Sequence, residues 1–365
     1  MSDFVCIAGA SSRARTAREY LEYIYPDLRV RAFLVSPEMT DNESIIDGVP
    51  VIAISGDADI DRTAKVYIGT RGINHEKLKR ELCAIGFETN SIIPISVDLD
   101  TKLRNEYVRR KFEEGGRPFV KFDEIGSVSR RETAAHKSVC IYVASSAFDG
   151  ELSDPYTSLE EEKILQVGAE LTDERIDGAV SYDDQGDNIS SRNKQFCELT
   201  GLYWIWKNAP EDIVGLVHYR RHFLLPEDWA DAFLRSGADV ILPVPLYVAP
   251  SIEVNYRLRH IASDWDNVME YLKDNYPEDY DRAYEFFKGG LYSPCNMLIT
   301  RKPVLDDLCE WMFPLLFDVA QKGGERDDKY QNRYPGFLSE RLMTYFFESR
   351  RDKYNIVYAD KNFLN

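Results

Sequence analysis

The sequence lacks the patterns typical of proteins that are stabilised by disulfides or by a structural metal, and of proteins that span a bilayer. Its six cysteines are scattered and no two of them form a C-x-x-C pair, which indicates buried free thiols in a reducing compartment. No apolar run approaches the ~18 residues that a membrane-spanning helix needs. The first residues lack the basic stretch and long apolar core of a signal peptide. We therefore expect a cytoplasmic protein without a transmembrane segment, for which peripheral membrane contact stays open.

Positive charge is also scarce. The 45 Lys and Arg residues are outnumbered by 62 Asp and Glu residues, which gives a formal net charge of −17. Such a chain repels nucleic acid and anionic lipid as a whole, so nucleic acid is excluded as a partner. The length of 365 residues and the hydrophobic share of 44% indicate a globular protein, and a length of this order favours two domains.

The first part of the chain alternates short apolar runs with helical stretches. Strands are expected at residues 4–8, 30–35, 49–54, 65–69 and 91–95, and helices at 14–25 and 75–85, a pattern typical of a parallel sheet. The first strand runs into Gly9, but the dinucleotide-binding fingerprint G-x-G-x-x-G is incomplete, because Ser11 and Ala14 replace its other two glycines. We expect a small Rossmann-like accessory domain with its linker at 1–135. An NAD-dependent sugar-modifying enzyme is an alternative.

The second domain, expected at 136–365, carries the more informative residues. An acidic loop at 183–190 leads into a predicted helix at 193–208, and a buried strand at 213–217 ends in His218-Tyr219-Arg220-Arg221. Ligands of open α/β sheets bind outside the carboxyl ends of the strands, and the guanidinium fork of arginine matches a diphosphate. The alternative is that both arginines pair with aspartates of the loop. A zinc pair of His218 and His222 is not favoured, because their spacing suits a helix and not a strand end.

Several motifs occur in order along the second domain: Gly186–Ile189, Cys197–Trp204, Gly215–Arg221, Asn296-Met297 and Gly336–Arg341. With these motifs the chain resembles the bacterial domain-of-unknown-function family 4422, glycosyltransferases of capsule, exopolysaccharide and O-antigen clusters. Residues 48–107 also resemble the small Rossmann-like domains found beside such enzymes. One departure is Ser145-Ser146, where many relatives have a His-Lys pair.

The resemblance implies a GT-A-like α/β domain that moves a sugar from a nucleotide sugar to a glycan or lipid-linked glycan acceptor. The implied donor is a UDP-sugar, and UDP-galactofuranose is one candidate. A noncatalytic component that binds a nucleotide sugar or a glycan remains an alternative.

In GT-A enzymes an Asp-x-Asp motif at the end of a central strand usually binds a divalent metal. The matching strand end here holds arginines and no carboxylate, so we expect guanidinium groups to stabilise the leaving diphosphate and no metal to be required. Mn²⁺ or Mg²⁺ held by Asp183, Asp184 or Asp187 stays open.

An inverting transfer also needs a general base. Glu340, expected near a helix start, is the first candidate and Asp187 the second. The candidate donor-binding residues are Asp187, Asn188, Asn193, Glu198, His218, Tyr219, Arg220, Arg221, Asn296 and Arg341.

Overall fold

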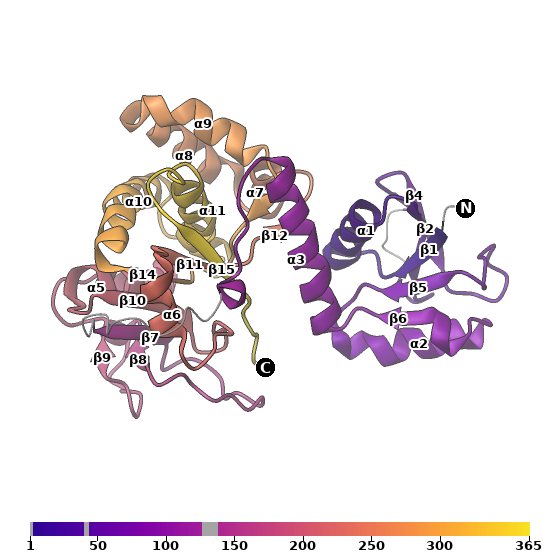
Figure 1. Ribbon diagram of the computed structural model, residues 1–365, viewed down its shortest axis with the longest axis horizontal. Coiled ribbons are helices and arrows are strands. Elements are labelled where there is room, and N and C mark those ends of the chain that lie inside the picture. The colour runs from indigo at the N-terminus through magenta and orange to yellow at the C-terminus, as the bar shows by residue number, and fades with distance from the viewer. Residues whose placement is uncertain (1–2, 40–43, 126–137) are drawn as a thin grey trace. The chain divides into compact units, whose positions relative to one another are not determined.

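The computed structural model describes residues 3–39, 44–125 and 138–365. The chain divides into two compact units, Met1–Arg117 and Pro118–Asn365, whose elements are labelled in Figure 1. Each unit is built around its own sheet, and both sheets are mostly parallel. The mixed α/β class expected from the sequence is therefore confirmed.

The first unit holds a six-stranded sheet in the order β3-β4-β2-β1-β5-β6. Its strands are β1 (Asp3–Ala8), β2 (Leu28–Val35), β3 (Ile45–Ile46), β4 (Val49–Ala53), β5 (Lys65–Ile68) and β6 (Ile92–Pro94). Only β3 pairs antiparallel, at the edge of the sheet. The helices are α1 (Ser12–Ile24), α2 (His75–Ala84) and α3 (Val97–Glu114). The expected alternation is confirmed, and α3 is an addition that the sequence reading did not assign.

The second unit begins earlier than composition suggests. The short segment after Pro118 packs into it: the Phe122 side chain is 2% exposed within the core of this unit, and the Lys121 ammonium pairs with Asp360 at 2.9 Å. The expected boundary at residues 135–136 lies outside the described residues. The second unit therefore begins within the charged stretch after residue 113, and the residues from Pro118 to Ile125 belong to this unit and not to a linker.

The second unit contains a seven-stranded sheet in the order β15-β11-β14-β10-β7-β8-β9. Its strands are β7 (Val139–Ser145), β8 (Glu162–Gln166), β9 (Ser181–Tyr182), β10 (Ile213–His218), β11 (Val240–Pro243), β14 (Leu298–Arg301) and β15 (Ile356–Ala359). Every pairing is parallel except the two made by β14. All residues of β10 are buried between β7 and β14, as expected for a strand that is apolar throughout.

The strand order reverses between β7 and β10. From β7 the chain continues outward through β8 and β9, and it then returns to place β10 on the other side of β7. The carboxyl ends of β7 and β10 meet at one edge of the sheet, with Ala144 opposite His218. Because β14 is antiparallel, the residues just before it reach the same edge. Ligands of open α/β sheets bind at such a switch point.

Helices surround this sheet (Figure 1). They are α4 (Asn193–Phe196), α5 (Leu199–Asn208), α6 (Trp229–Ser236), α7 (Ile252–Arg259), α8 (Ala262–Asn275), α9 (Pro277–Phe287), α10 (Lys302–Gly323) and α11 (Tyr334–Glu348). A small ribbon joins β12 (Leu246–Tyr247) to β13 (Leu291–Tyr292). Within the described residues, no helix combines the length and the apolar character needed to cross a membrane.

One expectation about helices is wrong, and the difference involves the site. The helix predicted at 193–208 is interrupted, because Cys197 adopts a left-handed φ of 51° between α4 and α5. The last long helix begins at Tyr334, so Glu340 lies in its second turn, near the helix start as expected. The 3₁₀ turn Gln331–Arg333 precedes that helix directly, so the ordered chain starts earlier than the Pro335-Gly336 signal indicates.

Candidate active site

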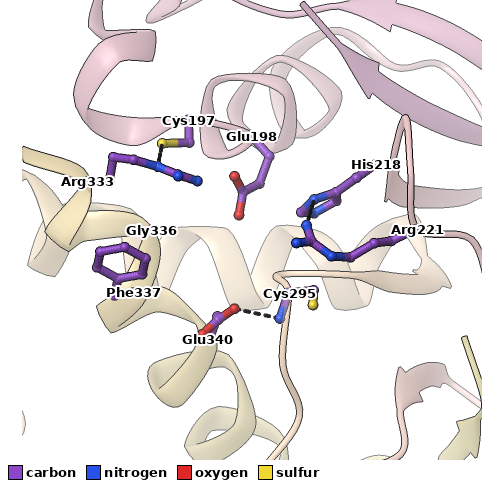
Figure 2. A pocket seen from close by; sticks show the side chains of 9 residues that line it. All are labelled: Cys197, Glu198, His218, Arg221, Cys295, Arg333, Gly336, Phe337 and Glu340. Atoms are coloured by element: carbon purple, nitrogen blue, oxygen red, sulfur yellow. Dashed lines mark hydrogen bonds between the residues drawn. The ribbon is translucent and has the colours of Figure 1, made fainter. Parts of the chain in front are cut away.

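A pocket of about 560 Å³, its open mouth included, lies at the carboxyl edge of β10. Figure 2 shows the side chains that surround it. They come from the end of β10, from the break between α4 and α5, from the segment before β14, and from the start of α11. The lining residues are Cys197, Glu198, His218, Arg221, Cys295, Arg333, Gly336, Phe337 and Glu340.

Two guanidinium groups reach this pocket from different elements (Figure 2). Arg221 follows β10, and its Nη1 lies 3.1 Å from Nδ1 of His218. Arg333 precedes α11, and its Nε donates to Sγ of Cys197 at 3.0 Å. Among the described residues neither arginine forms an ion pair with a carboxylate. Glu198 and Glu340 line the same pocket and interact electrostatically with Arg333 and Arg221, respectively, but no carboxylate of the described residues contacts either guanidinium directly. Both guanidiniums therefore keep donors for an anionic ligand.

His218 is neutral and fixed in one tautomer. Burial lowers the pKa of its imidazole to about 4, and the positive charge of Arg221 lowers it further, against the opposing effect of Glu198. A guanidinium has only donors, so Nδ1 of His218 must accept from Arg221 and the ring proton lies on Nε2. The imidazole orients the guanidinium without cancelling its charge.

Two carboxylates complete the pocket. Burial raises the pKa of Glu340, while Arg341 and the backbone N–H of Cys295 act in the opposite direction. Oε1 of Glu340 accepts from that N–H at 2.6 Å. Oε1 of Glu198 accepts from Nδ2 of Asn296 at 2.8 Å. The Glu340 side chain remains 18% exposed and so can be reached from the pocket, and a carboxylate with a raised pKa is suited to remove a proton near neutral pH.

The family comparison covers every residue that lines this pocket. Residues 155–351 match the family described as a domain of unknown function, DUF4422. The chain belongs to the DUF4422 family. The resemblance stated from the sequence motifs is thereby confirmed.

A solved structure is also similar to this DUF4422 protein. The apo structure of the bifunctional glycosyltransferase WbbM aligns with a TM-score of 0.53 and 25% sequence identity, over 62% of this chain and 45% of that one. The chain thus spans less than half the length of that neighbour. No curated protein matches the sequence.

Of the sequence-predicted residues, the structure brings four together in the pocket of the DUF4422 unit: Glu198, His218, Arg221 and Glu340. Arg220 does not line it. Its Nε donates to the Tyr219 hydroxyl at 2.8 Å. After β10 the chain reverses tightly, and His218 and Arg221 pair as an antiparallel bridge. Both guanidiniums lie near the Phe363 ring, but only Arg221 lines the pocket. The expected cation pair is corrected: Arg333 stands opposite Arg221.

The acidic loop also lies outside the pocket lining. Asp187 is exposed and accepts from the Tyr203 hydroxyl at 3.1 Å. Nδ2 of Asn188 donates to the Gly186 carbonyl at 3.0 Å, which stabilises the loop itself. The structure therefore does not place Asp187 beside the other proposed catalytic groups, and Asn188 has a local structural role.

The alternative in which these aspartates pair with the arginines is wrong. Asp183 accepts from the backbone N–H groups of Gly168 and Ala169 at 2.9 and 3.0 Å. Asp184 pairs with Arg175 at 2.9 Å. The carboxylates of this loop therefore hold other parts of the unit together.

Three further candidates act behind the pocket surface. Nδ2 of Asn193 donates to the Cys197 carbonyl at 2.9 Å, which supports the break between α4 and α5. Asn296 is 1% exposed, and Arg341 is 3% exposed with its Nη1 3.3 Å from Oε2 of Glu340. None of these three residues lines the pocket. The pocket lining therefore does not support the contact with a nucleotide-sugar donor that was expected for them from the sequence.

A divalent metal finds no suitable ligand set in the described part of the chain, where no three His, Cys, Asp or Glu side chains come together. Asp183, the most buried carboxylate of the acidic loop, already accepts from two N–H groups and the Ser190 hydroxyl. The residues present do not fit the metal site expected of a GT-A enzyme, and no chemical step is derived through one.

Five lining residues were not among the predicted site residues: Cys197, Cys295, Arg333, Gly336 and Phe337. Arg333 stands three residues before Gly336 of a quoted motif, and that proximity was the available signal. Its approach to Cys197 joins segments far apart in sequence, and no local pattern encodes such a contact.

Proposed function

We propose that the DUF4422 unit is a glycosyltransferase that moves a sugar from a nucleotide-sugar donor to a hydroxyl group of a glycan or lipid-linked glycan. The observation that carries the proposal is one pocket, at the switch point of the sheet, that combines two unpaired guanidiniums with two carboxylates. Family membership and the likeness to a bifunctional glycosyltransferase support it. A GT-A-like mode of donor binding is part of this proposal.

The guanidiniums of Arg221 and Arg333 would bind the diphosphate of the donor. As the glycosidic bond breaks, negative charge grows on the leaving diphosphate, and preorganised cations stabilise that charge more than they stabilise the ground state. Arg221 is held by a neutral imidazole and Arg333 by a thiol. Neither contact neutralises the cation, so both charges remain available to the ligand.

Glu340 would act as the general base of an inverting transfer. The acceptor hydroxyl attacks the anomeric carbon, its proton passes to Glu340, and the bond to the diphosphate breaks with its electron pair leaving on the nucleotide. Burial raises the pKa of Glu340, which brings the carboxylate closer to the working pH. Glu198 would accept a hydrogen bond from a sugar hydroxyl, since one of its oxygens is held by Asn296 and the other is not.

We further propose a UDP-sugar as donor, with UDP-galactofuranose as one candidate, in cytoplasmic synthesis of capsule, exopolysaccharide or O-antigen. A thermal-shift screen against UDP-, GDP-, CMP- and dTDP-sugars tests the donor class, because a ligand that binds only the native state raises the unfolding temperature. Transfer is then measured by release of the nucleoside diphosphate with and without glycan acceptors.

Stabilisation by a UDP-sugar and acceptor-dependent release of UDP are the expected results. Binding without release on any acceptor would favour the noncatalytic alternative. Stabilisation by NAD, with no response to any nucleotide sugar, would favour the NAD-dependent alternative in the first unit.

A further inference from the structure

A strained turn precedes β14 at the floor of the pocket. Cys295 has a φ of 79° and Asn296 a φ of 51°. Two consecutive residues other than glycine thus lie in the left-handed region, which side chains disfavour. Such conformations persist only where the surrounding structure holds them, and they concentrate at functional sites.

The contacts of this turn reach both pocket carboxylates. The backbone N–H of Cys295 donates to Oε1 of Glu340 at 2.6 Å. The side chain of Asn296 donates through Nδ2 to Oε1 of Glu198 at 2.8 Å and to the Gly336 carbonyl at 2.9 Å. One turn therefore connects the break between α4 and α5 with helix α11.

The Asn296 side chain is fully committed to the protein. Both acceptors near Nδ2 are oxygens, and the Ser339 hydroxyl lies 2.7 Å from Oδ1. These partners fix the orientation of the amide, because exchanging its oxygen and nitrogen would place oxygen against oxygen at Glu198 and Gly336. With 1% of its surface exposed, Asn296 has no donor atom left for a ligand.

We propose that the Cys295–Asn296 turn is the positioning element of this site, which sets the separation and orientation of the Glu198 and Glu340 carboxylates. The turn holds each carboxylate through its Oε1, and Oε2 of Glu340 also contacts Nη1 of Arg341 at 3.3 Å. Among the described residues, Oε2 of Glu198 receives no protein donor, so this oxygen is left for a substrate hydroxyl. The proposal deepens the proposed function and rests on it for its catalytic consequence, while the geometry of the turn can be tested without substrate.

The first test separates the side chain from the backbone. Asn296→Gly keeps a residue that tolerates a φ of 51° but removes the donor to Glu198. We expect kcat to fall about tenfold or more through misplacement of the carboxylate, while the thermal shift produced by UDP is unchanged. Asn255→Ala is the matched control: Asn255 is also buried, at 7% exposed, and its Nδ2 donates to the Ala249 carbonyl away from the pocket. This control should retain the wild-type kcat.

The second test needs no substrate. Asn296→Asp exchanges the donor for a carboxylate beside Glu198, and a like charge at that distance raises a carboxyl pKa, by about one pH unit or more. Carbon-13 NMR titration of labelled glutamate carboxylates, assigned with Glu198→Gln and Glu340→Gln, measures this shift directly. The same displacement is expected in the acidic limb of the kcat/KM profile.

An unchanged Glu198 titration in Asn296→Asp, or wild-type kcat in Asn296→Gly, would overturn the positioning role. If the wild-type protein transfers no sugar from any donor, the proposed function fails, and the NMR titration still decides whether the turn positions Glu198.

Discussion

The buried imidazole of His218 gives a prediction whose size follows from the structure. Burial lowers the pKa of His218 to about 4, from an ordinary value of 6.5. The unfolded chain therefore binds a proton at this residue where the folded chain does not. The contribution of His218 to the free energy of unfolding is therefore fully present above the unfolded pKa of 6.5, and it is lost as the pH falls from 6.5 towards 4. His218→Gln removes this titration and keeps an oxygen that can accept from Arg221.

The linkage relation sets the magnitude. Between pH 7 and pH 5, a shift from 6.5 to about 4 corresponds to a loss of about 2 kcal/mol of unfolding free energy from His218 alone. Other titrating groups contribute equally to wild type and variant. The expected observable is therefore a difference: wild type should lose about 2 kcal/mol more than His218→Gln over that pH interval.

Urea unfolding followed by tryptophan fluorescence measures this difference for the second unit alone, because all five tryptophans lie between residues 204 and 311. His75→Gln, in the first unit, is the control and should leave the fluorescence transition at both pH values as in wild type. Identical pH dependence in wild type and His218→Gln would refute the neutral, buried imidazole and with it the orientation of Arg221.

Other variants test the remaining assignments. Glu340→Gln should lower turnover by about 100-fold or more, and wild-type turnover would contradict the base role. Because burial raises the pKa of Glu340, its ionisation destabilises the folded state, so the variant should be more thermally stable than wild type above the ordinary carboxyl pKa, by an amount that grows with pH. Arg221→Ala and Arg333→Ala should each weaken UDP binding, measured by calorimetry, about tenfold or more. Arg220→Ala should weaken it much less, since Arg220 does not line the pocket. An equal loss of affinity in all three variants would contradict the pairing of Arg221 with Arg333. Turnover in excess chelator should stay within about twofold of that of the untreated protein. A loss of turnover that added Mn²⁺ reverses would contradict stabilisation of the diphosphate by the two guanidiniums alone.

The sequence was most informative where burial alone decides the structure. The strand predicted at 213–217 is β10, Ile213–His218, because an unbroken apolar run can only be satisfied inside a sheet. The helix predicted at 193–208 shows the limit of this reasoning. The spacing of its apolar residues indicates which side chains are buried. It carries no information on the left-handed backbone conformation of Cys197, which interrupts the helix. That break is stabilised by a local hydrogen bond from Asn193 to the Cys197 carbonyl, which the apolar periodicity does not report.

In the site, too, residues within local sequence motifs were predicted, whereas residues placed by contacts between distant segments were not. Glu198, His218, Arg221 and Glu340 were predicted because each lies in a motif with functional groups at a strand or helix end. Arg333 was missed because its place depends on how the turn before α11 packs near Cys197. Arg220 was expected in the site for a related reason: the sequence records that the two arginines are adjacent, but not that only Arg221 lines the pocket while Arg220 donates to the Tyr219 hydroxyl.

The choice of partner for Arg221 explains how a strongly acidic chain can hold an anionic ligand. With a formal net charge of −17, the long-range field opposes a diphosphate, so the attraction must be local. An arginine oriented by a carboxylate would be fixed in place but neutralised. His218 orients the guanidinium through a neutral nitrogen at 3.1 Å. Burial is the main cause of the lowered pKa that keeps the imidazole uncharged, and the nearby cation of Arg221 adds to it. The same arrangement predicts that UDP will bind more weakly below the pKa of His218, because a protonated imidazole can no longer accept from Arg221.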